Sequence, residues 1–398
     1  MIGPSRRILL AAAAALGAGA AAAKDNEPIS GNRGANILGP RDQPREDQNP
    51  DILRPPSTDR GTMPNLRFSF ADAHVKARDG GWSREVTQRE LPISTTMAGV
   101  NMRLKAGGVR ELHWHKQAEW AFMLAGNARV TAVDNDGLNF IADVKAGDLW
   151  YFPAGIPHSI QGLSGEGCEF LLAFPDGEFS EDNTFAITDL FAHNPRDALA
   201  KDLSIAPDAL RNIPKEELFI FQADLPPPLR EDTVSDPHGR VAQDMVFKLM
   251  ERPPTNSPGG RVRIADTRNF PISTDVAAAH VEVDPGHMRE IHWHPNADEW
   301  QYYISGKARM TVFGAEAKAR TFDFQAGDVG YVPMSMSHFI ENTGSEPVRF
   351  LELFRSPRFM DVSLAQWMAL TPHELVQAHL NIDRSMLERL RKEKQPVV

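Results

Sequence analysis

A short stretch with two histidines separated by one residue occurs twice, and this repeat limits the folds open to the chain more than any other feature. The copies span residues 107–126 and 286–306, at an offset of 179 residues (292 − 113). Each carries a glutamate soon after its second histidine, which gives the sets His113, His115, Glu119 and His292, His294, Glu299. Alternate residues of a β-strand point to the same face, so each His-Trp-His sequence directs two imidazoles to one place, where a carboxylate from the next strand can join them.

A third histidine follows each copy. Ala-Gly-Asp leads to His158 in the first copy and to His338 in the second. Three imidazoles and one carboxylate form a closed set of ligands, and this mixture suits Mn, Fe, Co, Ni or Zn better than Ca or Mg. The sequence therefore predicts two divalent metal sites in one chain.

The duplication extends beyond the histidines. Pro-Ile-Ser-Thr stands at 92–95 and again at 271–274, at the same offset, so whole domains were duplicated. Short alternating runs separated by Gly and Pro are typical of β-strands, and residues 134–137, Asp-Asn-Asp-Gly, predict a hairpin turn. We expect an all-β fold with helical appendages, built from two tandem barrels. The helical segments, 184–222 and 362–393, are expected to bury their apolar faces between barrels or subunits.

The N-terminus predicts export. Ser5-Arg6-Arg7 precedes an Ala/Leu-rich run that ends at Ala23. This run is too short and too weakly apolar for a membrane span, and the arginine pair resembles a twin-arginine signal. An ordinary secretory signal is the alternative. We expect residues 1–23 to be removed and the mature protein to be periplasmic or secreted, with no membrane attachment.

Composition sets the remaining boundaries. Residues 24–65 are rich in Pro, Asn, Asp and Arg and predict an extended arm that lies on a barrel or on a partner subunit. The first barrel domain is assigned to residues 66–235 and the second to 236–398. A net charge of −10 without a basic stripe argues against a nucleic-acid partner. The one cysteine, Cys168, excludes an internal disulfide and is expected to be buried in the run CEFLLAF.

The spacings resemble the two motifs of the cupin superfamily. Gly107, Gly126, Gly147, Pro153 and Gly155 complete the first copy of that pattern. The second copy has Ser335 where glycine is usual, so the turn there is expected to be altered without loss of a ligand. The resemblance implies double-stranded β-helix (jelly-roll) barrels. Seed-storage bicupins have lost the ligands, which leaves an inert double barrel as one alternative.

A narrower resemblance covers the chain from about Phe68 to the C-terminus. The strings REVTQRELPIST, NMRLKAGGVRELHWHKQAEWA and TPHELVQAHL are similar to those of bacterial and fungal oxalate decarboxylases. The resemblance implies two Mn(II) ions per chain, a requirement for dioxygen, and conversion of oxalate to formate and carbon dioxide. It also implies a homo-oligomer, either a trimer or a hexamer built as a dimer of trimers.

Two arginines take their expected role from this resemblance. Arg110 would lie beside the first metal and orient a bound carboxylate, and Arg289 is its counterpart in the second barrel. Strict alternation places Arg110 on the opposite face from His113 and would turn Glu111 inward instead. The expected role therefore requires a bulge or a strand start before Leu112.

The expected proton donor is Glu181. Related decarboxylases carry a Ser-Glu-Asn-Ser lid after the first barrel, and residues 180–183 here read Ser-Glu-Asp-Asn. A solvated acidic loop is the alternative interpretation. After the second barrel we expect no carboxylate at the equivalent place, and Glu352, in the run FLELF, is the next candidate acid.

Other functions remain open at this point, because a fold does not fix a function. An oxalate oxidase would use the same metal and yield peroxide and carbon dioxide. A metal-dependent sugar isomerase, a dioxygenase, or a non-enzymatic metal-binding bicupin of the periplasm would also fit two intact ligand sets.

Overall fold

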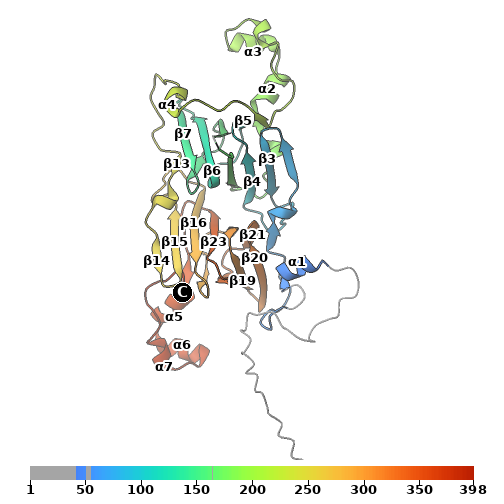
Figure 1. The fold of residues 1–398 in the computed structure, drawn as a ribbon. Helices are drawn as coiled ribbons and strands as arrows, with labels where there is room; N and C mark the ends of the chain where they lie inside the picture. The colour runs from blue at the N-terminus through green and yellow to red at the C-terminus, as the bar shows by residue number, and fades with distance from the viewer. Residues whose placement is uncertain (1–41, 51–54, 164) are drawn as a thin grey trace, which may run out of the picture.

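The computed structural model describes residues 42–50, 55–163 and 165–398, which form two β-barrels stacked end to end (Figure 1). Residues 1–23 and the first part of the arm lie outside this range, so the expected signal peptide stays a prediction. Among the helices within the described residues, none is long and apolar enough to cross a membrane.

The first barrel is antiparallel. Its strands are β2 Val75–Arg78, β3 Gly81–Val86, β4 Ala98–Leu104, β5 Gly108–Trp114, β6 Glu119–Val133, β7 Asn139–Lys145, β8 Leu149–Phe152, β9 His158–Gly162 and β10 Cys168–Phe174. The long strand β6 bends in the middle, pairing with β8 and β10 in its first half and with β7 and β9 in its second. Gly126 permits this bend: its φ is +72°, and a Cβ there would lie 2.0 Å from the carbonyl oxygen of Gly167.

The second barrel repeats this plan with two separate sheets. Its strands are β14 Thr255–Ser257, β15 Gly260–Ala265, β16 Val276–Val283, β17 Met288–Trp293, β18 Glu299–Ser305, β19 Lys307–Gly314, β20 Lys318–Gln325, β21 Asp328–Val332, β22 Ser337–Asn342 and β23 Val348–Arg355. The sheet orders are β1-β21-β18-β23-β16-β15-β14 and β20-β19-β22-β17-β24. The two tandem barrels predicted from the repeat are confirmed, as is the jelly-roll form that the cupin resemblance implies.

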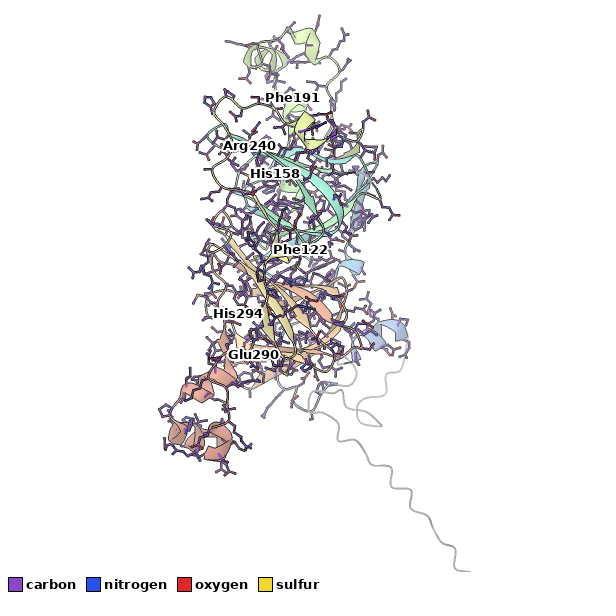
Figure 2. The ribbon with its side chains drawn as sticks, turned by 60° about the vertical axis from the view of Figure 1, so that its left-hand side comes forward. Phe122, His158, Phe191, Arg240, Glu290 and His294 are labelled. Carbon is purple, nitrogen blue, oxygen red and sulfur yellow. The ribbon has the colours of Figure 1, made fainter. Side chains whose placement is uncertain are left out.

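Each barrel is extended by a strand from the segment that precedes the other barrel in the sequence. Strand β1 (Arg67–Ser69) pairs with β21 of the second barrel, and β13 (Val246–Phe247) pairs with β8 of the first. One hydrophobic cluster spans both barrels and includes Trp120, Tyr151, Trp300 and Tyr331. Phe122 lies near the junction, between His158 of one barrel and His294 of the other (Figure 2).

Buried hydroxyl groups tie the barrels together in a reciprocal way. The Tyr151 hydroxyl donates to Asp275 of the second barrel at 3.0 Å, and the Tyr331 hydroxyl lies 2.9 Å from the Thr96 hydroxyl of the first. The two tyrosines are 180 residues apart (331 − 151). The duplication that placed the metal ligands therefore also built the interface.

The helical tails do not pack between the two barrels, which was one of the two predicted locations, and packing between subunits stays a prediction. The first contains β11 Phe185–Ala186, α2 Ile187–His193, α3 Arg196–Asp202, β12 Ile220–Gln222 and α4 Leu229–Asp232, and the second contains β24 Val362–Ser363, α5 Leu364–Leu370, α6 His373–Leu380 and α7 Arg384–Leu387. Helices α3 and α5–α7 project from opposite ends of the molecule (Figure 1). Strands β11 and β24 join the tails to the barrels by pairing with β5 and β17, the strands that carry metal ligands. Large apolar residues of the tails remain exposed, among them Leu203, Trp367, Leu370 and Leu380. Within residues 42–50, 55–163 and 165–398, neither barrel covers these faces.

The described part of the arm is not wholly extended. Helix α1 (Gln43–Gln48) begins where the Asp42 carboxylate accepts from the Arg45 amide, with a proline in its first turn. Further along, Asp59 accepts from the backbone and hydroxyl of Thr321, and Arg60 bridges to Ala319. The arm therefore lies on β20 of the second barrel.

Two smaller predictions are confirmed. The Asp134 amide donates to the Leu138 carbonyl at 2.9 Å, and Gly137 has a φ of +79°, which makes the expected hairpin turn. Cys168 is 1% exposed.

The turn at Ser335 is retained, contrary to the expectation that a serine would alter it. Gly155 and Ser335 have φ values of +78° and +67°, and their amides donate to the carbonyls of His115 and His294 at 2.9 and 3.0 Å. The left-handed conformation strains a residue with a Cβ.

We expect Ser335→Gly to relieve this strain. Because glycine also loses more backbone entropy on folding, the gain in the free energy of unfolding should be only about 0.5–1 kcal/mol. Denaturant unfolding measures it. Gly155→Ser is the matched reverse change and should lower stability by a similar amount. Equal or lower stability of Ser335→Gly would show that the serine is not strained.

Candidate metal centres

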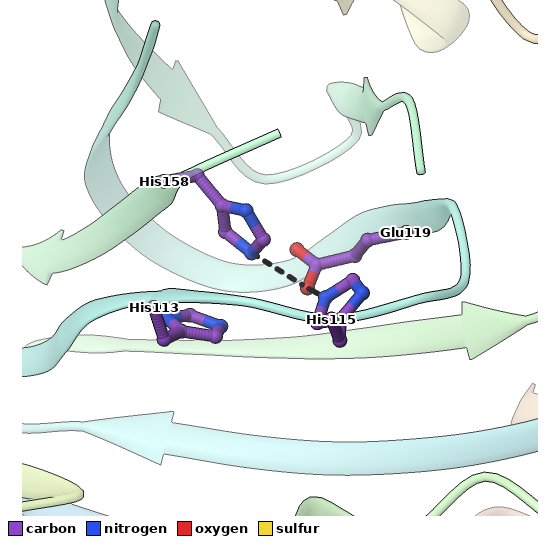
Figure 3. Close-up of side chains that lie close together, drawn as sticks. All are labelled: His113, His115, Glu119 and His158. Atoms are coloured by element: carbon purple, nitrogen blue, oxygen red, sulfur yellow. Dashed lines mark hydrogen bonds and ion pairs between the residues drawn. The ribbon is translucent and has the colours of Figure 1, made fainter. Parts of the chain in front are cut away.

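The first cluster of predicted ligands converges inside the first barrel (Figure 3). His113 lies on β5 and His115 follows that strand, while Glu119 and His158 begin β6 and β9. Their ligand atoms lie within 4.8 Å of one another, and all four side chains are buried. The Oε2 atom of Glu119 is 3.3 Å from the Nε2 atoms of both His115 and His158.

The second cluster repeats this geometry. His292, His294, Glu299 and His338 bring their ligand atoms within the same 4.8 Å and are equally buried. Here Glu299 Oε2 lies 3.0 Å from His294 Nε2 and 2.7 Å from His338 Nε2. The structure thus brings all eight predicted ligands together in two sets.

Backbone carbonyls fix the orientation of every imidazole in the two sets. Each Nδ1 atom lies 2.6–3.2 Å from a carbonyl oxygen, those of Glu111, Gln117, Ile156, Glu290, Met360 and Met336. A carbonyl only accepts, so Nδ1 carries the proton and Nε2 presents its lone pair to the centre. Burial, together with the nearby Arg110 guanidinium, holds the pKa of His113 well below its usual value, which keeps that ring neutral.

The donor sets fit a divalent transition metal. The buried Nε2 atoms of His158, His292, His294 and His338 have no hydrogen-bond partner among the described residues, which would be unfavourable without a further partner. A metal ion at each centre would satisfy them, and three imidazoles with one carboxylate suit an ion such as Mn(II).

The two centres use different residues to donate a hydrogen bond to the metal-binding glutamate. Trp150 donates its indole N–H to Glu119 at 2.9 Å. In the second barrel Gln301 donates to Glu299 at 2.8 Å and accepts from the Tyr303 hydroxyl at 2.9 Å. None of these three residues was predicted from the sequence. In the first barrel Ala121 pairs with Trp150, and at the corresponding place in the second barrel Gln301 pairs with Gly330. Aligning the two repeats would reveal this difference.

Arg110 lies on the same side as the ligands because of a β-bulge. Between Arg110 and His113, strand β5 advances three residues while β9 advances two, from Ile160 to His158. The same irregularity separates Arg289 and His292. The bulge predicted before Leu112 is therefore confirmed. Glu111 turns outward beneath the first helical tail, where it accepts from Thr188 and from the Phe219 amide.

Glu181 reaches into the first barrel rather than into solvent. It begins a single turn at Glu181–Asn183, is 6% exposed, and places Oε2 3.1 Å from Arg110 Nη2. Burial raises the pKa of Glu181, and the neighbouring Glu119 adds to this, while Arg110 opposes it. The carboxyl therefore keeps its proton to a higher pH than an exposed glutamate does.

The second barrel does contain a carboxylate at the equivalent place, so the prediction that it has none is wrong. Asp361 lies 180 residues after Glu181 (361 − 181) and accepts from Arg289 Nη2 at 2.7 Å. Glu352 accepts from Arg289 Nε at 3.0 Å. Burial opposes ionisation of Asp361, but Arg289 and Lys394 outweigh it and lower its pKa to about 2. Asp361 is thus a fixed negative charge, unlike Glu181.

Comparison with known proteins agrees with this geometry. The Cupin family model matches residues 69–211 and 247–388. The chain is 54% identical over 372 residues to oxalate decarboxylase OxdC of Bacillus subtilis, covering 94% of this chain and 96% of that protein. It is 39% identical over 380 residues to a probable oxalate decarboxylase of Arthroderma benhamiae, covering 94% and 93% of the two chains.

Solved structures of the Bacillus subtilis enzyme have the same fold. The structure at pH 4.6 superposes with a TM-score of 0.91 and covers 94% of this chain and 98% of its own. Another, with the same TM-score, belongs to a study of the Mn(II) centres of that enzyme. Two ligand sets, two cupin matches and similarity over nearly the whole length lead to one conclusion. The chain belongs to the cupin family and, within it, to the two-barrel oxalate decarboxylases.

Proposed function

We propose that this protein is a manganese-dependent oxalate decarboxylase. It converts oxalate and a proton to formate and carbon dioxide, with one Mn(II) ion in each barrel and dioxygen as a required cofactor. The observation that carries the proposal is Glu181, a buried acid that is paired with Arg110 beside a complete ligand set.

The first ligand set, His113, His115, Glu119 and His158, would hold the ion of the first barrel. When bound, the metal supplies a Lewis-acidic, redox-active centre for a carboxylate of the substrate. Arg110 is placed to orient that carboxylate. Its Nη2 pairs with Glu181, but its Nε is buried and has no hydrogen-bond partner in the part of the chain that the structure describes. A planar guanidinium with an unused donor suits an incoming carboxylate.

Glu181 supplies the proton that distinguishes formate from carbon dioxide. When the carbon–carbon bond of oxalate breaks, one carbon leaves as carbon dioxide and the other must gain a proton to become formate. An acid that keeps its proton through burial is suited to this transfer. The turn that carries Glu181 also covers the site and keeps water away from it.

We place the chemistry in the first barrel because Arg289 is already occupied in the second. Its Nε donates to Glu352, its Nη2 to Asp361 and its Nη1 to the Pro396 carbonyl. The chain itself thus fills the positions that a substrate carboxylate would need. Glu352 remains the candidate acid of the second barrel, since burial raises its pKa against the effect of Arg289.

The pKa of Glu181 predicts a pH dependence. Its folded-state pKa lies above the ordinary value of 4.5. The contribution of the protonated side chain to stability is therefore fully present below pH 4.5 and is lost as pH rises through the folded-state pKa. Formate production should fall over the same interval. Thermal unfolding of wild type and Glu181→Gln across pH 4–8 measures this, and a constant difference between them would contradict a raised pKa.

An oxygen measurement tests the reaction type. A decarboxylase produces formate while consuming much less than one dioxygen per oxalate. An oxalate oxidase consumes dioxygen stoichiometrically and releases peroxide. Simultaneous recording of formate, dioxygen and peroxide with the Mn-loaded protein separates the two.

The arginine pair at Arg6 and Arg7 and the apolar run to Ala23 support export of the mature protein to the periplasm or medium. N-terminal sequencing of the native protein should then find a start near Lys24. An intact Met1 on the native protein would contradict export with cleavage. The exposed apolar residues of the helical tails support a homo-oligomer, in which a neighbouring copy would cover them.

A further inference from the structure

Phe219 occupies an unusual backbone position beside Arg110. Its φ is +62°, a conformation that favours glycine, and its side chain is fully buried. The backbone is held there by strand β5. The Phe219 amide donates to Glu111 Oε1 at 2.5 Å, and its carbonyl accepts from Arg110 Nη1 at 3.3 Å. The strained conformation thus fixes the ring next to Arg110.

Two cations contact this ring. The Arg110 guanidinium carbon lies 4.4 Å from the ring centroid, and the Lys76 Nζ lies 3.9 Å from it. Lys76 belongs to β2, which forms one edge of the sheet of the first barrel. A cation within about 6 Å of an aromatic centroid is attracted by the negative face of the ring.

Lys76 also contacts the lid, which we define as residues 180–184. Its Nζ lies 3.2 Å from Asp182 Oδ1, the residue that follows the proposed acid. On the other side of the acid, the Glu181 amide donates to Glu85 of β3 at 3.1 Å. The lid is therefore held at two neighbouring residues. Glu181 contacts Arg110 and Asp182 contacts Lys76, and both cations pack on the Phe219 ring.

We propose that Lys76 is a positioning residue that holds the lid closed over the first metal centre while its ammonium group packs against the Phe219 ring. We call these two contacts of Lys76, with Asp182 and with Phe219, the latch. The inference rests on the proposed function and assigns it a residue outside both the lid and the ligand set. A cavity of about 330 Å³, lined in part by His74, Lys76 and Asp182, borders the lid and gives the loop room to move outward. Release of Lys76 would favour that movement.

The two contacts of Lys76 differ in strength. The Asp182 side chain is 78% exposed, so its ion pair with Lys76 contributes little by itself. The Lys76 side chain is only 25% exposed, and its contact with the ring is correspondingly less screened by water. An ordinary surface ion pair would depend on Asp182 alone, whereas the latch depends also on the Phe219 ring, which holds the Lys76 ammonium beside the lid.

Hydrogen exchange of the lid amides in the Mn-loaded protein tests the latch. Lys76→Met keeps the aliphatic stem, removes both contacts, and should accelerate exchange at residues 181–184 by about fivefold. Asp182→Asn removes only the ion pair and should accelerate it by about twofold after correction for intrinsic rates. Arg78→Met, on the same strand, is the control and should leave lid exchange unchanged, because within the described residues the Arg78 side chain hydrogen-bonds to the Ala77 carbonyl and not to the lid.

Product analysis of the same variants separates the latch from the proposed function. With Lys76→Met we expect more peroxide per oxalate consumed, at unchanged metal content and unchanged exchange of strand β10. Lid exchange equal to that of wild type in Lys76→Met would overturn the latch. Faster lid exchange with unchanged products would support the latch and instead contradict the role of the lid in choosing the product.

Discussion

His113→Ala is expected to leave the protein with one bound metal ion per chain and to lower formate production at least about 100-fold. The substitution removes one of four buried ligands and leaves Glu119, His115 and His158 with an incomplete set. The helical tails and the second centre do not depend on this side chain, so the fold should persist. Metal analysis by mass spectrometry, together with a formate assay on the same sample, measures both quantities.

His292→Ala is the matched control. It should also remove one metal ion, but from the barrel in which Arg289 is already paired with Glu352 and Asp361. Formate production per first-site metal should therefore remain close to that of wild type. Full formate production by His113→Ala, or a greater loss in His292→Ala at equal loading and stability, would place the chemistry in the second barrel.

Glu181→Gln is expected to cut formate production by about 100-fold or more while both metal ions remain bound. The amide keeps the size of the side chain and a hydrogen-bond acceptor for Arg110 but cannot release a proton. Because the metal ligands and dioxygen access are unaffected, oxalate that is still consumed should yield more peroxide. Formate and peroxide are measured together on protein of matched Mn content.

Glu178→Gln provides the control for the Glu181 experiment. Glu178 lies in the same loop but is exposed, so its substitution should change neither product. Wild-type formate turnover in Glu181→Gln would exclude Glu181 as the proton donor. Glu352, buried beside Arg289 in the second barrel, would then be the residue to test.

The sequence predicted the metal ligands well because their spacing is local. His113 and His115 need only the alternation of one strand, and Glu119 and His158 follow at distances that the duplication repeats to within one residue. Arg110 could not be placed in this way. Its direction depends on a bulge that arises from pairing with β9, and alternation alone would have chosen Glu111.

The features that the sequence did not reveal depend on contacts between distant segments. Asp361 was overlooked because its role is defined by Arg289, 72 residues earlier, and not by its neighbours. Phe219 lies 109 residues from Arg110, and its backbone conformation follows no local motif. The helical tails were expected between barrels or between subunits because their apolar faces need cover, but nothing in those faces indicates which surface supplies it.

The most direct test of the proposed function is the stoichiometry of oxalate conversion by Mn-loaded protein. Proton NMR of the reaction at mildly acidic pH, with carbon dioxide trapped in parallel, measures both products against oxalate consumed. The expected result is one formate and one carbon dioxide per oxalate, lost on removal of the metal and restored by Mn(II). Two carbon dioxide molecules and one peroxide per oxalate, or equal turnover by the metal-free protein, would contradict a manganese-dependent decarboxylase.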